Sequence, residues 1–374
     1  MNKIRLATVF SGIGSIEFAL KRLNIPHNIV FACDNGERDN LPIDYEREFA
    51  SIKKLCTIEE KHDYVENLYS KITRRTNFVE KSYLANYKIE KNRFYQDIKL
   101  LDGTDFYQKV DLLVGGSPCQ SFSSVGAQAG LEDVRGTLFY DFARLIKEIQ
   151  PKIFIYENVR NLLKHNKGNT WRVIYEVFSS LGYNIKENVL NAADYGIPQN
   201  RRRLFVIGYK ESKKDFVFPT PINLKYKMSD FLIDNCADGC FSYDKNGNIQ
   251  IKHQQGKVEQ KYFLSPLVYK YVMSSGTKTW HQKPEINKEV ARTLLKTMGN
   301  KHRAGVDNYY SNDGSTSQGK VRALTERECL RLMGYTDDFK IVVSKAQMYK
   351  QAGNSIVVDV MMQIIKKLLL DNFL

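Results

Sequence analysis

Residues 6–20 read LATVFSGIGSIEFAL, and this stretch decides the fold class. Its first five residues are apolar or β-branched, which predicts a buried strand. Gly12 and Gly14 predict a tight turn, and the apolar residues Ile16, Ala19 and Leu20 then fall on one face of a helix. A strand, a glycine turn and a helix in this order predict the first unit of a doubly wound α/β sheet, in which ligands bind at the carboxyl ends of the strands.

Further apolar runs extend this alternation of strands and helices along the first half of the chain. Residues 28–33, 110–114 and 153–156 predict buried parallel strands, because each is a short apolar run followed by a glycine or an acidic residue. Residues of about 36–81 interrupt the alternation with a highly charged insertion that is expected to be helical. The predicted fold class is therefore α/β, with a mostly parallel, doubly wound sheet.

The chain has 374 residues, enough for two domains. We expect a catalytic and cofactor-binding domain over residues 1–211, a smaller irregular domain over 212–334, and a segment over 335–374 that returns to the first domain. No apolar run reaches the ~20 residues of a membrane span, and no signal peptide is recognised, so a cytoplasmic protein is expected. The six cysteines are scattered, which predicts neither a disulfide framework nor a metal site.

The net charge of +14 is concentrated in one part of the predicted second domain. Residues 245–303 contain twelve Lys and Arg against three Glu, with aromatic residues such as Tyr262, Tyr269 and Trp280 among them. A charge run alone is most simply interpreted as a solvated, lysine-rich surface. The interleaved aromatic residues favour a nucleic-acid-binding face, since phosphate contacts supply most of the affinity for nucleic acid.

A cysteine follows the predicted strand at 110–114, in the stretch GGSPCQ at residues 115–120. Most lone cysteines are small core residues, and this is one interpretation of Cys119. Pro118 before it and polar residues after it favour a second interpretation, in which the thiol lies on a turn at the end of a strand, within reach of a ligand. Asp34, which follows the strand at 28–33, is placed to bind a ribose diol, so the glycine turn and Asp34 together predict an adenosine-containing cofactor.

Six motifs, in one order along nearly the whole chain, resemble those of the DNA cytosine-5 methyltransferase family of the bacterial restriction-modification type. They are Phe10 to Gly14 with Glu17, Gly116 to Gln120, Glu157-Asn158-Val159, Gln199 to Arg203, Arg322 to Thr325 with Glu328 to Gly334, and Gln351 to Ser355. The resemblance implies a Rossmann-like methyltransferase sheet with a second, smaller target-recognition domain.

The resemblance also implies S-adenosyl-L-methionine as the cofactor. It assigns to that cofactor the residues Phe10, Gly12, Ile13, Gly14, Asp34, Asn35, Asp97, Ile98, Pro118, Asn354 and Ser355. Asp34 would bind the ribose, Asp97 would face the adenine amino group and Ile98 would pack on the ring. Two positions depart from the family pattern: Gln96 replaces a usual glycine, and Asn35 replaces an aromatic or apolar residue.

For the chemistry, the resemblance implies that the Cys119 thiolate adds to C6 of a flipped-out cytosine and so activates C5. Glu157 would protonate the ring nitrogen N3, which requires a raised pKa. Arg203 would contact the cytosine or its phosphate, and Arg201 would hold the catalytic loop or the Cys119 region. The residues expected at the DNA are Gln120, Ser123, Arg135, Arg292, Thr293 and Arg303.

The expected function is methylation of cytosine C5 in a specific short sequence of double-stranded DNA, by a monomer that protects host DNA beside a separate cognate restriction endonuclease. Two alternatives remain open. A transfer-RNA cytosine-5 methyltransferase of the same fold is one, and Cys240-Phe241-Ser242 faintly resembles an element of that branch. An inactive DNA-binding paralogue is the other, although Cys119, Glu157 and Arg203 are all retained.

Overall fold

The computed structural model describes residues 3–118, 138–210, 214–276 and 281–374. Four of the residues predicted to act in catalysis or DNA binding, Cys119, Gln120, Ser123 and Arg135, lie outside the described residues.

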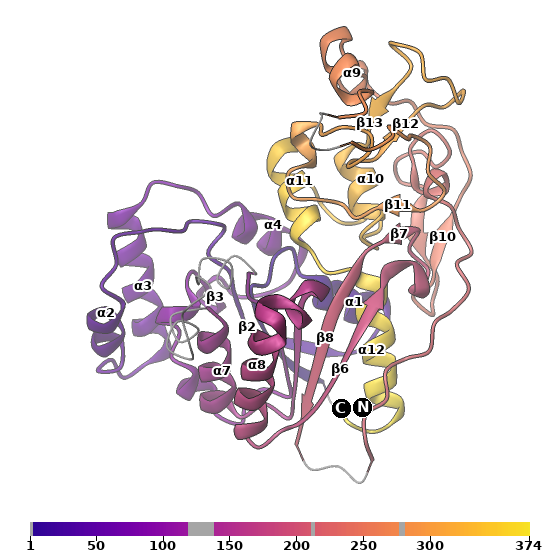
Figure 1. Ribbon diagram of the computed structural model, residues 1–374. Coiled ribbons are helices and arrows are strands. Elements are labelled where there is room, and N and C mark those ends of the chain that lie inside the picture. The colour runs from indigo at the N-terminus through magenta and orange to yellow at the C-terminus, as the bar shows by residue number, and fades with distance from the viewer. Residues whose placement is uncertain (1–2, 119–137, 211–213, 277–280) are drawn as a thin grey trace.

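A seven-stranded sheet with the order β3-β2-β1-β4-β5-β8-β6 forms the centre of the larger part of the molecule (Figure 1). The strands are β1 (Ile4–Val9), β2 (His27–Cys33), β3 (Phe94–Tyr95), β4 (Leu112–Gly115), β5 (Ile153–Val159), β6 (Asn184–Asn191) and β8 (Arg202–Tyr209). The first five strands in this order are parallel, and β8 runs antiparallel between β5 and β6. The chain reverses its direction of winding between β1 and β4, where open α/β sheets bind their ligands.

Helices cover both faces of this sheet because alternate side chains of each strand point to opposite faces. Leu112 belongs to the hydrophobic cluster of α1 (Ser15–Arg22), α4 (Phe78–Asn86) and α12 (Val358–Leu370). Its neighbour Leu113 belongs to the cluster of α7 (Leu138–Ile149) and α8 (Asn169–Ser180) on the other face. The prediction of a doubly wound, mostly parallel α/β sheet is confirmed.

The charged insertion is helical, as predicted, with α2 (Tyr45–Ile52) and α3 (Ile58–Ile72). Both helices begin with a capped turn, since Asp44 and Thr57 accept hydrogen bonds from the backbone amides of Arg47 and Glu60. The insertion has a small core of its own in which Ile52, Val65, Tyr69 and Leu100 are buried together. Leu100 follows β3, so this core fastens the insertion to the edge of the sheet.

The rest of the chain is built from short elements that lie beyond one end of the sheet (Figure 1). These are β7 (Gln199–Asn200), β9 (Phe241–Tyr243), β10 (Ile249–Ile251), α9 (Pro266–Val272), β11 (Ala291–Arg292), β12 (Tyr309–Tyr310), β13 (Arg322–Ala323), α10 (Glu326–Arg331) and α11 (Lys345–Asn354). The strands pair only in twos. The domain boundaries at 211/212 and 334/335 stay predictions.

Among the described residues, the structure shows neither a helix suited to cross a membrane nor a cluster of side chains suited to bind a metal ion. None of their helices combines the length and the hydropathy that a membrane crossing requires. Nor do their His, Cys, Asp and Glu side chains gather in groups of three or more that suit a metal ion.

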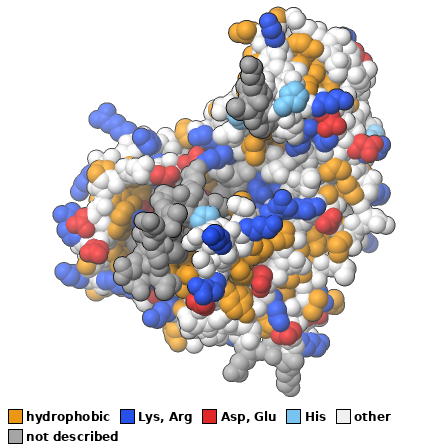
Figure 2. Space-filling view, viewed as in Figure 1, with side chains coloured by type: hydrophobic (Ala, Val, Ile, Leu, Met, Phe, Trp, Pro, Cys, Tyr) orange, Lys and Arg blue, Asp and Glu red, His pale blue; other side chains and the backbone are white. Residues whose placement is uncertain are grey.

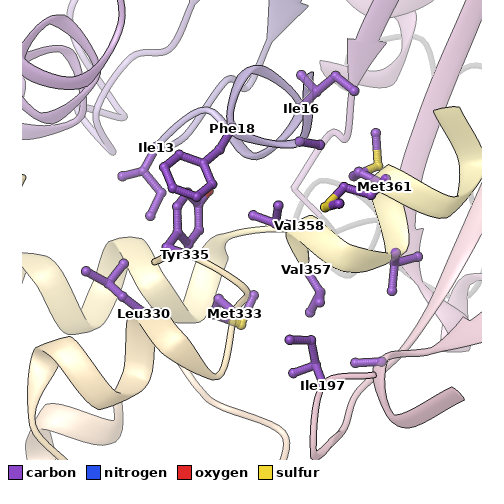
Figure 3. Close-up of a cluster of buried hydrophobic side chains, with 14 of the residues drawn as sticks. Ile13, Ile16, Phe18, Ile197, Leu330, Met333, Tyr335, Val357, Val358 and Met361 are labelled. Carbon is purple, nitrogen blue, oxygen red and sulfur yellow. The ribbon is translucent and has the colours of Figure 1, made fainter. Parts of the chain in front are cut away.

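The C-terminal helix α12 packs against α1 at the start of the chain (Figure 3). Phe18 on α1 contacts Tyr335, with ring centroids 5.0 Å apart. Beside this contact Arg22, whose side chain is fully buried, forms an ion pair with Asp359 at 2.7 Å. The same guanidinium also donates to the carbonyl oxygens of Gly247 and Gly334, so every part of this buried cation is held.

Removing the anion of this pair is expected to be costly. We expect Asp359→Ala to lower the free energy of unfolding by about 3 kcal/mol, because Arg22 would stay buried without a counter-charge. Denaturant unfolding monitored by circular dichroism measures this change. Lys21→Ala is the matched control: it breaks an exposed ion pair with Asp338 and should cost less than about 1 kcal/mol. Equal losses in the two variants would contradict the expected cost of the buried charge.

Candidate functional site

A cavity of about 580 Å³ lies at the carboxyl ends of β1, β2, β4 and β5. Its walls come from the glycine turn after β1, residues 34–38 after β2, residues 116–118 after β4 and residues 157–159 at the end of β5. Arg201 and Arg203 of the β7–β8 segment and the end of α11 complete it. Lys and Arg side chains gather on the surface between the sheet and the part of the molecule beyond it (Figure 2). The cavity has the volume of a site for a ligand of cofactor size.

The glycine turn and Asp34 form one end of this cavity. Phe10, Gly12 and Gly14 all have positive φ angles, of 52°, 54° and 74°. A Cβ on Gly14 would lie 2.3 Å from the ring of Tyr87, so only glycine fits there. The amides of Gly12 and Gly36 donate to the two carboxylate oxygens of Asp34 at 2.9 and 2.8 Å. Burial raises the pKa of Asp34, and these two hydrogen bonds oppose the rise.

Glu157 and Arg203 also line this cavity. The strand β5 extends three residues beyond the predicted apolar run, so Glu157 lies within the strand, where it is paired with Phe205 of β8. Its Oε1 lies 3.2 Å from Nε of Arg203. Burial raises the pKa of the Glu157 carboxyl above its usual value, while Arg203 and Arg201 act in the opposite direction. A buried carboxyl with a raised pKa can donate a proton to a ligand.

A buried hydrogen-bond network holds the segment that leads to Cys119. The hydroxyls of Ser117 and Tyr156 lie 2.7 Å apart. The side-chain amide of Asn158 donates to the Ser117 carbonyl at 3.0 Å and to the Tyr156 hydroxyl at 2.9 Å. This network joins the turn after β4 to the end of β5, and it places Pro118 in the same cavity wall as Glu157.

Arg201 holds the backbone on both sides of Asn354. Its guanidinium donates to the carbonyl oxygens of Gly353 and Ser355 at 2.9 and 2.8 Å, and to that of Leu294 at 2.9 Å. Burial lowers the pKa of Arg201 to about 9. Although the sequence predicts a role beside the catalytic loop, these described contacts tie the expected cofactor segment to the residues that follow β11.

The predicted cofactor residues do not all reach the cavity. Phe10, Gly12, Asp34, Asn35, Pro118 and Asn354 line it, and Ser355 lines a small cavity beside it. Ile13, Gly14, Asp97 and Ile98 are not among the residues of either wall. The Asp97 carboxylate instead accepts hydrogen bonds from the hydroxyls of Tyr69 and Tyr45 at 2.6 and 3.2 Å. Both tyrosines belong to the insertion, so Asp97 fastens the insertion to the sheet.

Of the described residues expected at DNA, all three make contacts within the chain. The Arg292 guanidinium donates to Glu285 Oε2 at 3.0 Å. The Thr293 hydroxyl donates to the Asn200 carbonyl at 2.7 Å. Arg303 lies over the ring of Tyr271. None of these three lines the cavity described above.

Several cavity residues were not predicted from the sequence. They are Gly36, Glu37, Arg38, Arg75, Thr76, Phe78, Val79, Lys296, Gln347 and Lys350. Glu37 lies at their centre, because it pairs with Lys296 at 3.1 Å and with Lys350 at 3.3 Å and accepts from the Asn354 side chain at 3.0 Å. In the sequence, the departures from the family pattern at Asn35 and Gln96 were the only signal near these residues.

The residues present fit an adenosine-containing cofactor. Asp34 offers a fixed carboxylate at the cavity wall, which suits the hydroxyls of a ribose. A Cβ on Gly12 would meet no other atom within 4 Å than the Phe10 carbonyl oxygen at 4.0 Å, so a ligand can approach the backbone of the turn. Glu157 lines the same cavity as Asp34.

Comparisons with known proteins show which family this chain resembles. The model of the family described as C-5 cytosine-specific DNA methylase matches residues 4–370. The type II methyltransferase M.SsoII of Shigella sonnei is 33% identical over 305 residues, which cover 78% of this chain and 71% of that protein. The type II methyltransferase M.HhaI of Haemophilus parahaemolyticus is 35% identical over 256 residues, covering 68% of this chain and 74% of its own.

Among solved structures, the S. pombe Dnmt2 methyltransferase is similar over 99% of each chain, with a TM-score of 0.69 and 18% sequence identity. At this identity the likeness concerns the fold alone.

Proposed function

Because the chain belongs to the C-5 cytosine-specific DNA methylase family, we propose that it transfers the methyl group of S-adenosylmethionine to C5 of a cytosine in a short sequence of duplex DNA. One observation carries this proposal. A single cavity joins the fixed carboxylate of Asp34 to the Glu157–Arg203 pair, with Pro118 in the wall between the strands that carry them.

Asp34, Gly12 and Asn354 would hold the cofactor. The Asp34 carboxylate would accept hydrogen bonds from the ribose hydroxyls, and Gly12 would leave room for close approach. Arg201 would keep Asn354 in place through the carbonyls on either side of it. The cofactor, when bound, supplies a methyl group on a positively charged sulfur, which is an electrophile.

Cytosine C5 is a weak nucleophile, and Cys119 would activate it. Its thiolate would add to C6, which makes C5 the nucleophilic carbon of an enamine. C5 would then take the methyl group, with neutral S-adenosylhomocysteine as the leaving group. Loss of the C5 proton to water, departure of the thiolate and return of the N3 proton to Glu157 would restore the aromatic ring. Cys119 follows Pro118 directly in the sequence, and Pro118 lies in the cavity wall.

Glu157 and Arg203 would act on the cytosine ring. As the sulfur adds, negative charge builds on the ring and is neutralised when Glu157 donates a proton to N3. Burial favours the protonated form of Glu157, which is the form that donates. Arg203 keeps the carboxyl oriented through its 3.2 Å contact and brings a positive charge to the ring.

The target base would have to leave the DNA helix to enter this cavity, at a cost of a few kcal/mol. Lys296, Lys350 and Arg75 lie in the cavity wall and supply positive charge where the DNA backbone would pass. The cations of residues 245–303 would extend this charge along the second part of the molecule. The protein would act as a monomer and protect host DNA beside a separate restriction endonuclease.

Bisulfite sequencing of plasmid DNA from cells that express the chain tests this proposal. We expect 5-methylcytosine at one short sequence motif on nearly every plasmid copy and at no other cytosine. Plasmid from cells that express Cys119→Ser is the control. Methylated transfer RNA together with unmethylated plasmid would contradict the proposal and identify RNA as the substrate.

A further inference from the structure

Asn35, the residue after Asp34, provides no stacking surface for the adenine base of the proposed cofactor. Asn35 cannot stack on an adenine ring, because its side chain is used within the loop: Oδ1 accepts from the Glu37 amide and Nδ2 donates to Asp39, both at 2.9 Å. Asp97, the residue expected at the adenine amino group, is buried at 7% exposure and bonded to two tyrosines. A base in this cavity therefore needs another flat surface.

Arg38 offers one. It lines the cavity with Asp34 and is only 8% exposed. Its Nε donates to the Asn35 carbonyl at 2.8 Å, and its backbone amide donates to the same oxygen. This turn places Arg38 in the same cavity wall as Asp34, whose carboxylate is the group proposed to bind the ribose.

The guanidinium is fixed on most of its sides. Nη2 donates to the side-chain oxygen of Gln96, and one face lies over the ring of Tyr69 at 4.8 Å from its centroid. Gln96 is itself held, since it accepts from Asn77 at 3.0 Å and donates to Glu80 at 3.0 Å. Arg38 is nevertheless among the residues that line the cavity, so part of its side chain is open to a ligand there.

We propose that the second face of the Arg38 guanidinium is the surface on which the adenine ring of the cofactor stacks, backed by Tyr69 of the insertion. This inference rests on the proposed function and deepens it. The three planar groups would lie in the order tyrosine, guanidinium and adenine, and guanidinium planes stack well on aromatic rings. Gln96 and Tyr69 of the insertion would then both hold the planar guanidinium of Arg38, which supplies the stacking surface that Asn35 cannot provide.

Isothermal titration calorimetry with two ligands tests the proposal. S-adenosylhomocysteine carries the base, the ribose and the amino acid, whereas 5′-methylthioadenosine carries the base and the ribose without the amino acid. Arg38→Lys keeps the charge and removes the plane, so it should weaken both ligands by the same factor, about tenfold, as expected for one lost base-stacking contact. Arg47→Lys, the same substitution at an exposed arginine of the insertion, should leave both affinities unchanged.

A loss for S-adenosylhomocysteine alone would overturn the proposal, because Arg38 would then hold the amino-acid end through its free edge. Unchanged binding of both ligands would overturn it as well. If the wild-type protein binds neither ligand, the proposed function itself fails, and the two failures are thus distinct.

A second pair of variants decides the matter if Arg38→Lys does not fold. Tyr69→Phe keeps the backing ring and loses only the hydrogen bond to Asp97, so its affinity for 5′-methylthioadenosine should equal that of the wild type. Tyr69→Leu removes the ring that holds the guanidinium flat and should weaken the same ligand several-fold. Equal affinities in these two variants would contradict the stacked arrangement.

Discussion

Cys119→Ser is expected to abolish methyl transfer, with a fall in kcat of at least about 10⁴-fold. A serine hydroxyl is almost never ionised at neutral pH, so the covalent route through C6 is lost. DNA binding should persist, since it depends on phosphate contacts made elsewhere. Transfer of tritiated methyl groups to duplex DNA measures the first effect, and gel mobility shift measures the second.

Cys56→Ser is the matched control for this variant. Cys56 is an exposed free cysteine of the insertion, and its replacement should leave the rate of methyl transfer unchanged. Undiminished methylation by Cys119→Ser would contradict the covalent mechanism. Loss of activity in both variants would show that the assay responds to thiols in general.

Glu157→Gln is expected to lower kcat by about 10³-fold, within the range that general acids contribute. Glutamine keeps the size and the hydrogen-bonding oxygen of the side chain but cannot deliver a proton to N3. In the wild type, kcat should fall as the pH rises through the raised pKa of Glu157, because the donating form is then lost. The variant should lack this fall, and a pH profile of single-turnover rates measures it.

The control for Glu157→Gln is Glu187→Gln, at an exposed position of β6. It should match the wild type in rate and in pH profile. An alkaline fall that persists in Glu157→Gln would assign the titration to another group and contradict the role of Glu157 as the acid.

The fold was predictable where local sequence decides it. Gly12 and Gly14 require positive φ angles, and short apolar runs such as 110–114 can be buried only as central strands. The order of the strands was not predictable in the same way, because pairing of β1 with β4 joins segments about a hundred residues apart. The family resemblance supplied what the local patterns lacked, and the match over residues 4–370 confirms it.

The site was predictable for residues whose chemistry is visible at a strand end, such as Asp34 and Glu157. Arg201 was predicted as a site residue, but its contacts were not predictable, since its partners Leu294 and Gly353 follow it by 93 and 152 residues. The contribution of the insertion to the cavity was not predictable either, because the sequence of a charged helix is similar whether the helix faces water or a cavity. Gln96 stood out in the sequence only as a departure from the family pattern, whereas in the structure its side-chain oxygen accepts a hydrogen bond from Arg38.

The packing of α12 against α1 has a consequence for the synthesis of this protein. Arg22 finds its partner Asp359 only 337 residues later in the chain. At about 5–20 residues per second a ribosome needs roughly half a minute to cover that distance. During this time α12 cannot cover the apolar face of α1, so we expect a chain that lacks α12 to expose this face. The core between the sheet and α1 is therefore complete only after α12 has been synthesised.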